Sequence, residues 1–198
     1  MNVLIIGSGG RESAIAWAVK RSPKVNHVYT VPGNGGTLKY GENILIDATY
    51  PYVELLNFAE DADIGLVIIG PEQPLVDGMS DIFRKAGYPV FGPSKKAARL
   101  EGSKAYMKDF MARYKIPTAR FKIFDNADDA FAYVNKEKQP FVVKTDGLAA
   151  GKGALVNKTV DETMEAIRRI MVLREFSEAG KRIIIEDMLK GTEVSVFI

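Results

Sequence analysis

Short apolar segments that alternate with helix-like segments constrain the fold of this chain more than any other feature. Residues 3–6, 27–31 and 64–69 are apolar segments of this kind, and the first runs directly into Gly7. Continuous apolar strands are typical of sheets that are covered on both faces. Strands that alternate with helices indicate βαβ units and a mainly parallel sheet. We therefore predict an α/β fold with an N-terminal doubly wound parallel sheet.

A different pattern begins after residue 100. A helix is predicted over residues 103–114, with Tyr106, Phe110 and Met111 on its inward face. Strand-like segments then surround a glycine-rich loop, which is typical of a β-hairpin. We expect two domains, residues 1–100 and residues 101–198, with the boundary near residues 93–102.

Periodicity predicts the remaining elements. The spacing of Leu75, Met79, Ile82 and Phe83 favours one continuous helix that ends near Gly87. Further strands are predicted over residues 43–46, 89–91, 119–124, 141–144, 154–156, 182–189 and 193–198, and further helices over residues 12–20, 51–60, 127–136 and 160–171.

Composition excludes several kinds of site. The chain has no cysteine and a single histidine, His27, so disulfides, cysteinyl zinc sites and thiol catalysis are excluded, and a histidine-based triad is not expected. Lys and Arg number 27 against 25 Asp and Glu, which is too balanced for binding nucleic acid mainly through phosphate neutralisation. No apolar run approaches the ~18–20 residues of a membrane span. The first residues show no signal-peptide pattern. We expect a cytoplasmic protein that binds neither nucleic acid nor membrane.

The glycine-rich loop after the first strand nearly matches the dinucleotide fingerprint. That fingerprint needs a third small residue, but Glu12 stands there, and no acid lies between residues 24 and 40 to hold a ribose. Backbone N–H groups at strand ends attract anions, and Arg11 adds a positive charge. A phosphate-bearing ligand is therefore favoured over a dinucleotide, with a purely structural turn as the alternative.

A second cluster, residues 143–153, carries two lysines among three glycines. Glycines let backbone N–H groups approach a polyphosphate, and lysine supplies a point charge. The spacing is not that of a Walker A loop, because Gly153 stands where Ser or Thr is required. The pattern indicates a hairpin flap over phosphates, with a structural turn as the alternative.

Six motifs occur in an order that we identify with one enzyme family. They are VLIIGSGGRE (3–12), PGNGGT (32–37), GPEQPL (70–75), FGP (91–93), LEGSK (100–104) and KTDGLAAGKG (144–153). Over residues 1–198 the chain resembles the glycinamide ribonucleotide synthetases (phosphoribosylamine–glycine ligases), which are ATP-grasp enzymes of purine biosynthesis. The resemblance implies a Rossmann-like, substrate-binding domain over residues 1–100 and a partial ATP-grasp domain over residues 101–198.

The resemblance also implies a reaction. ATP phosphorylates the carboxylate of glycine, and the amine of phosphoribosylamine then displaces phosphate to give glycinamide ribonucleotide. The implied cofactors are ATP and Mg²⁺ or Mn²⁺, and the implied partners are small molecules, with a monomer expected. Such catalysis is mostly positioning and charge neutralisation. No catalytic residue is assigned.

Site residues follow from the motif positions. For ATP binding the resemblance implies the phosphate-binding lysines Lys104 and Lys144, the flap residues Gly147, Gly151, Lys152 and Gly153, the adenine segment Glu186, Asp187 and Leu189, and the ribose acid Glu193. For phosphoribosylamine it implies Gly9, Gly10, Arg11, Glu12, Gly33, Asn34, Pro71 and Glu72.

Two departures from the family pattern stand out. Ser13 occupies the position where the family usually has His, which puts any substrate contact from that side chain in doubt. The family's metal ligands belong to strands after the adenine segment, so we expect them beyond residue 198. On this basis the chain looks truncated and is expected to be inactive alone.

Two other classes remain open. One is a non-catalytic nucleotide-binding fragment that retains the nucleotide contacts without the metal site. The other is a Rossmann oxidoreductase, which the position of Glu12 argues against.

Overall fold

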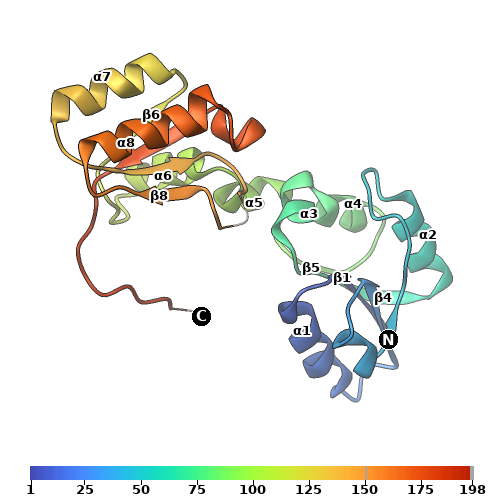
Figure 1. The fold of residues 1–198 in the computed structure, drawn as a ribbon. Coiled ribbons are helices and arrows are strands. Elements are labelled where there is room, and N and C mark those ends of the chain that lie inside the picture. The colour runs from blue at the N-terminus through green and yellow to red at the C-terminus, as the bar shows by residue number, and fades with distance from the viewer. Residues whose placement is uncertain (150, 197–198) are drawn as a thin grey trace. The chain divides into compact units, whose positions relative to one another are not determined.

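The computed structural model describes residues 1–149 and 151–196. The chain divides into two compact units, Met1–Arg99 and Leu100–Ile198, each with its own sheet and core (Figure 1). Helix α5 (Lys95–Gly102), which has no counterpart among the predicted elements, spans the division.

The N-terminal unit is built on a parallel sheet. Its strand order is β3-β2-β1-β4-β5, and β1 pairs in parallel with both β2 and β4. This order confirms the predicted doubly wound sheet. The strands are β1 (Asn2–Gly7), β2 (His27–Pro32), β3 (Glu42–Asn43), β4 (Ile64–Ile69) and β5 (Val90–Phe91), and the helices are α1 (Gly10–Lys20), η1 (Thr37–Lys39), α2 (Val53–Asp61), α3 (Glu72–Asp77) and α4 (Met79–Lys85).

Alternate residues of β1 enter two separate cores. Leu4 and Ile6 pack with Phe83 on one face of the sheet, whereas Val3 and Ile5 pack with a second cluster on the other face. A strand buried on both faces has no polar positions, which explains its continuous apolar sequence. The carboxyl ends of these strands are therefore fixed at one edge, where the glycine-rich loops follow.

Two predicted elements of this unit are wrong. The single helix expected through Leu75 and Phe83 is two helices, because Gly78 between them has a left-handed φ of 98°. A left-handed residue ends an α-helix, and glycine adopts that conformation without steric cost. The strand predicted over residues 43–46 is reduced to a two-residue pairing, Glu42–Asn43.

The C-terminal unit contains an antiparallel sheet with the order β6-β9-β7-β8. Strand β9 lies inside the sheet, antiparallel to both β6 and β7, and β7 and β8 form the predicted hairpin. The elements are α6 (Lys104–Arg113), β6 (Phe121–Phe124), α7 (Ala127–Glu137), β7 (Val142–Thr145), β8 (Ala154–Val156), α8 (Val160–Ile167), η2 (Arg168–Val172), η3 (Ser177–Gly180) and β9 (Ile183–Glu186).

The inward face of α6 differs from the prediction. Its fully buried side chains are Ala105 and Lys108, whereas Tyr106, Phe110 and Met111 are only half-buried. The spacing of apolar residues predicts which apolar side chains face inward, but it does not predict a buried lysine. Lys108 is consequently a charged residue that the sequence did not assign to any site.

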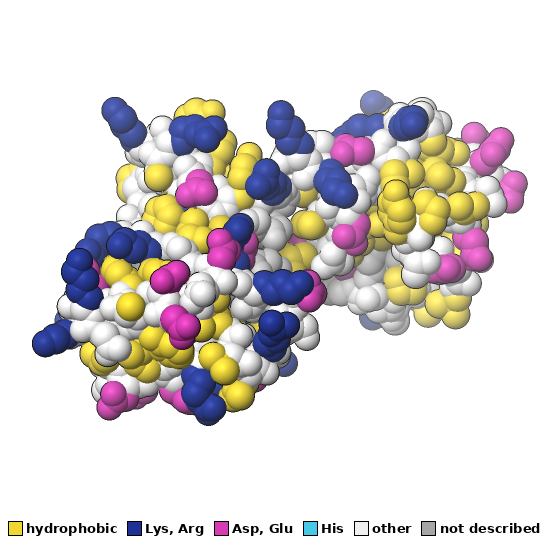
Figure 2. Space-filling model, turned by 90° about the horizontal axis from the view of Figure 1, so that it is seen from above, with side chains coloured by type: hydrophobic (Ala, Val, Ile, Leu, Met, Phe, Trp, Pro, Cys, Tyr) yellow, Lys and Arg dark blue, Asp and Glu magenta, His cyan; other side chains and the backbone are white. Residues whose placement is uncertain are grey.

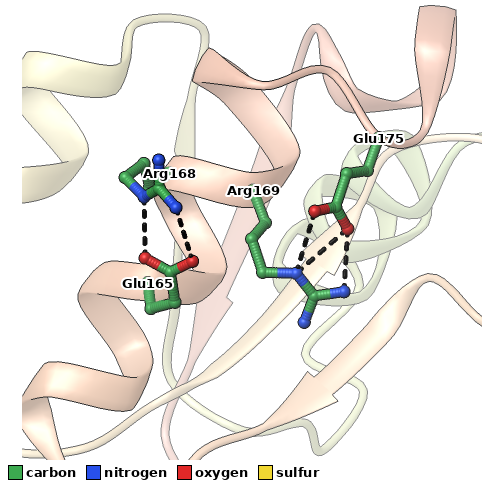
Figure 3. A network of polar contacts seen from close by, with 4 residues as sticks. All are labelled: Glu165, Arg168, Arg169 and Glu175. Atoms are coloured by element: carbon green, nitrogen blue, oxygen red, sulfur yellow. Dashed lines mark hydrogen bonds and ion pairs between the residues drawn. The ribbon is translucent and has the colours of Figure 1, made fainter.

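The end of α8 carries a cluster of exposed ion pairs. The predicted helix does not continue in α form to residue 171 but passes into a π-helical turn, Arg168–Val172. Arg168 pairs with Glu165 at 2.7 Å and Arg169 pairs with Glu175 at 2.7 Å (Figure 3). Pairs as exposed as these are screened by water and contribute little to stability.

The segment after β9 differs from the prediction. No strand is formed over residues 187–196, so the strand expected at 193–198 is absent from the described part, and residues 197–198 lie outside the described residues.

Charges are mixed on the face drawn in Figure 2, where Lys and Arg side chains are interspersed with Asp and Glu. Among the described residues no helix is long and apolar enough to cross a membrane.

Candidate functional site

A cavity of about 340 Å³ lies in the C-terminal unit between helices α5 and α6 and the β7–β8 hairpin. We call it the hairpin cavity. Two lysines face it, Lys104 from the first turn of α6 and Lys144 from β7. Its other lining residues are Leu100, Glu101, Met107, Leu148, Ala149, Gly151, Gly153 and Ala154.

Lys104 is held at the start of α6 by a short polar network. Its Nζ donates to the carbonyl of Gly147 at 2.6 Å. Asp146 accepts from the hydroxyl of Ser103 at 3.0 Å and from the backbone N–H of Ala105 at 3.1 Å, which ties the hairpin loop to the helix. Asp146 was not assigned a role from the sequence, because its partners lie on a distant helix.

Burial lowers the pKa of Lys104 from its ordinary value of 10.5. The carboxylates of Asp146 and Glu101 oppose this effect, and the ammonium of Lys144 adds to it. Because burial penalises the charged form, an anion in the cavity would stabilise the ammonium of Lys104 and raise its pKa.

Lys144 is positioned by a buried carboxylate. Its Nζ lies 3.1 Å from Oε2 of Glu186, the last residue of β9, and its side chain is 29% exposed. The carboxylate itself is buried and also lies 3.0 Å from Nζ of Lys108. One carboxylate therefore holds two ammonium groups, of which only that of Lys144 lines the hairpin cavity among the described residues.

Glycines shape the hairpin loop. Gly147 and Gly151 have φ values of +103° and +78°, a region that L side chains rarely adopt. A Cβ on Gly153 would overlap the hydroxyl of Thr145. The exposed Lys152 closes a turn by donating its backbone N–H to Ala149 at 2.9 Å.

The other predicted ATP-binding residues lie outside the cavity lining. Asp187 is held by Arg120, with Nε 2.9 Å from its Oδ2. Leu189 is 76% exposed, and Glu193 is exposed in a segment without regular structure. The structure thus gathers Lys104, Lys144, Gly151 and Gly153 around one cavity, whereas the lining does not include the other predicted residues, Gly147, Lys152, Glu186, Asp187, Leu189 and Glu193. Nucleotide contacts from these residues stay predictions.

A second cavity, of about 370 Å³, lies in the N-terminal unit at the carboxyl ends of β1 and β2. Arg11 lines it and pairs with Glu72 at 3.1 Å. The pKa of Glu72 is lowered mainly by a hydrogen bond from its own backbone N–H; desolvation opposes this effect, and the charge and hydrogen bond of Arg11 add to it. The remaining lining is Ile6, Gly7, Ser8, Gly9, Glu12, Val31, Pro32, Ala48, Pro71, Pro74 and Met79.

The structure explains Glu12 at the third fingerprint position. Its side chain is 3% exposed, and its Oε2 accepts from the backbone N–H of Gly9 at 2.5 Å. A Cβ on Gly7 would lie 2.7 Å from Cδ of Glu12, and a Cβ on Gly70 would overlap Oε1. The glycines make room for this carboxylate at the N-terminus of α1, where the helix dipole favours negative charge. The side chain of Glu12 thus occupies the space beside Gly7, Gly9 and Gly70.

Asn34 holds the loops of this rim together. Its Oδ1 accepts from the backbone N–H of Gly36 at 2.6 Å and from the hydroxyl of Ser13 at 2.9 Å. Its Nδ2 donates to the carbonyls of Ser8 and Gly9, each at 2.9 Å. Ser13 thus contributes to loop structure at the position where a family His was expected. The neighbouring Gly33 has a φ of +73°, and Gly10 begins α1.

A parallel α/β unit followed by an antiparallel sheet with a lysine-faced glycine hairpin defines an ATP-grasp protein. The biotin carboxylase domain of the Hydrogenobacter thermophilus 2-oxoglutarate carboxylase, solved with ADP and magnesium, shares this fold at 17% identity, with a TM-score of 0.72 over 96% of this chain and 44% of that one. The chain belongs to the phosphoribosylglycinamide synthetase family, whose N domain matches residues 1–101 and whose ATP-grasp (A) domain matches residues 102–198.

Named relatives agree with this assignment. The chain is 50% identical to the phosphoribosylamine–glycine ligase of Haemophilus influenzae over all of its own length and 46% of the relative's. The phosphoribosylamine–glycine ligase structure from Thermotoga maritima is 33% identical, with a TM-score of 0.78 over 97% of this chain and 45% of that one. The chain therefore spans about half the length of the relatives it matches.

Over residues 1–149 and 151–196 no group of three or more His, Cys, Asp or Glu side chains is placed to hold a metal ion. Binding of Mg²⁺ or Mn²⁺, which the resemblance to the family implies, stays a prediction.

The packing of Glu12 predicts the effect of enlarging Gly70. Gly70→Ala should destabilise the N-terminal unit by roughly 1–3 kcal/mol, because the added Cβ overlaps the Glu12 carboxylate. Gly70→Ala made in a Glu12→Ala background should cost markedly less, because the overlapped atoms are gone. Urea unfolding followed by the fluorescence of Trp17, the single tryptophan, reports on this unit.

Gly35→Ala is the matched control, because no atom within 4 Å would meet its Cβ. It should change the free energy of unfolding by less than about 0.5 kcal/mol. Equal destabilisation by Gly70→Ala with and without Glu12 would contradict this account of the glycine loop.

Proposed function

We propose that this chain is the nucleotide-binding portion of an ATP-dependent carbon–nitrogen ligase that joins glycine to phosphoribosylamine. The observation that carries the proposal is the hairpin cavity, where Lys104 and Lys144 face one space beneath a glycine-rich flap. The relatives of the chain are named for this reaction. Its expected cytoplasmic location and monomeric state stay predictions.

The charges of the hairpin cavity suit a nucleoside triphosphate. Phosphate oxygens need positive charge and N–H donors, which two ammonium groups and a glycine-rich loop supply. Transfer of the terminal phosphoryl group to the glycine carboxylate turns a poor electrophile into an acyl phosphate with a good leaving group. The contribution of these residues is to position the triphosphate and offset its charge.

The N-terminal cavity suits the second substrate, and we assign phosphoribosylamine to it. Arg11 lines the cavity and offers a guanidinium to a phosphate. Glu12 also lines the cavity, and its buried Oε1 has no hydrogen-bond partner among the described residues. These groups support the assignment of the rim without placing the substrate.

Calorimetric titration with ADP tests the proposal. ADP should bind, and Lys144→Met should weaken binding by at least about tenfold, because one phosphate-facing charge is lost. Lys136→Met is the matched control, since Lys136 is exposed on α7, and it should leave the affinity unchanged. Binding of NADH with no binding of ADP would contradict the proposal and favour an oxidoreductase.

Turnover separates ligase from nucleotide-binding fragment. The chain mixed with ATP, Mg²⁺, glycine and phosphoribosylamine should bind nucleotide but release little ADP, because no metal-binding group lies in the described residues. ADP release that depends on both substrates at an ordinary enzymatic rate would show instead that the chain is a complete catalyst.

The lowered pKa of Lys104 predicts a pH dependence. A bound phosphate favours the ammonium, so binding takes up a proton once the free lysine has begun to lose it. ADP affinity should therefore fall as pH rises through the lowered pKa, below 10.5, by at most about tenfold per pH unit. Lys104→Arg, which keeps its charge, should move this fall to higher pH. The same pH profile for both proteins would contradict the role of Lys104.

A further inference from the structure

Lys108 is a buried charge without an assigned role. Its side chain is 5% exposed, on the face of α6 that packs against the sheet. Lysine is rarely buried unless it is paired, because removing an ammonium from water is costly. Its partners therefore show what the position requires.

The contacts of Lys108 lead to one carboxylate. Its Nζ lies 3.0 Å from Glu186 Oε2 and donates to the hydroxyl of Thr118 at 2.5 Å. The ring of Phe121 lies 5.6 Å from the same nitrogen, a cation–π contact. These contacts hold the ammonium beneath the sheet rather than in the hairpin cavity.

The same oxygen of Glu186 also holds Lys144. Nζ of Lys144 lies 3.1 Å from Glu186 Oε2, and its side chain is 29% exposed at the cavity wall. The three side chains together carry two positive charges and one negative charge. If Lys108 were neutral, the charges of Glu186 and Lys144 would cancel, and the cavity would lose the net attraction that Lys144 provides.

We propose that Lys108 is a positioning residue for nucleotide binding: it anchors the Glu186 carboxylate and offsets its charge, so that Lys144 presents a net positive charge to the polyphosphate. The proposal rests on the proposed function of the hairpin cavity. Lys108 acts through Glu186 and does not itself reach the ligand.

A purely structural role for Lys108 would have a different signature. Loss of packing or of local order would weaken the binding of every ligand of the cavity to a similar extent. Loss of charge compensation makes the binding free energy less favourable by an amount that grows with the negative charge of the ligand. The ratio of the affinities for ADP and adenosine therefore separates the two roles.

The experiment is calorimetric titration of the full chain and its variants with ADP and with adenosine. Lys108→Met should weaken ADP binding by about tenfold and change adenosine binding by less than about twofold. Lys108→Met combined with Glu186→Gln should bring the ratio of ADP to adenosine affinity back to within about threefold of that of the unsubstituted chain, because any adenine contact of Glu186 affects both ligands alike. In that variant the removed positive and negative charges balance, and an amide oxygen can still accept from Lys144.

Two further variants keep the test informative. Lys108→Arg retains the charge and should retain the ratio of ADP to adenosine affinity even if the single methionine variant folds poorly, which circular dichroism will show. Lys136→Met removes one exposed charge elsewhere in the unit and should leave both affinities unchanged.

The outcomes distinguish this proposal from the proposed function. An equal loss of ADP and adenosine binding in Lys108→Met, or no recovery in the double variant, would overturn the role of Lys108 while leaving the nucleotide site intact. Failure of the unsubstituted chain to bind ADP at all would overturn both.

Discussion

The buried carboxylate of Glu186, shared between two lysines, is the interaction on which the candidate site depends. A carboxylate removed from water needs compensating charge, and Lys108 and Lys144 provide it at 3.0 and 3.1 Å. Because β9 lies inside the antiparallel sheet, Glu186 at its end is fixed relative to β7 and the flap that follows. The pairing of β7 with β9 and the ion pair with Glu186 therefore fix the position of Lys144 at the cavity wall.

The N-terminal unit also contains a buried carboxylate, that of Glu12, but this one is held by backbone groups rather than by lysines. Glu12 is held by a backbone N–H and by the N-terminus of α1, with three glycines making room for it. In this unit the Glu12 side chain therefore occupies the space beside Gly7, Gly9 and Gly70. We therefore propose that nucleotide phosphates bind in the lysine-faced cavity of the C-terminal unit and that the N-terminal rim binds a smaller substrate.

Much of this organisation could be predicted from local sequence. The continuous apolar strands predicted the parallel sheet because burial on both faces leaves no polar position, and the glycines between residues 147 and 153 predicted the hairpin. The helix break at Gly78 was missed because apolar spacing continues across it. The ion pair of Lys108 with Glu186 and the contacts of Asn34 with the Ser8–Gly9 loop were not predicted, because these partners are distant in sequence.

We propose that nucleotide binds at the β7–β8 hairpin and not at the glycine loop after β1. Hydrogen–deuterium exchange of the chain with and without ADP tests it most directly. The account predicts that ADP slows exchange in the backbone amides of β7, the hairpin loop and the end of β9, with little change over residues 7–12 and 33–37. Slowed exchange confined to residues 7–12 and 33–37 would contradict it.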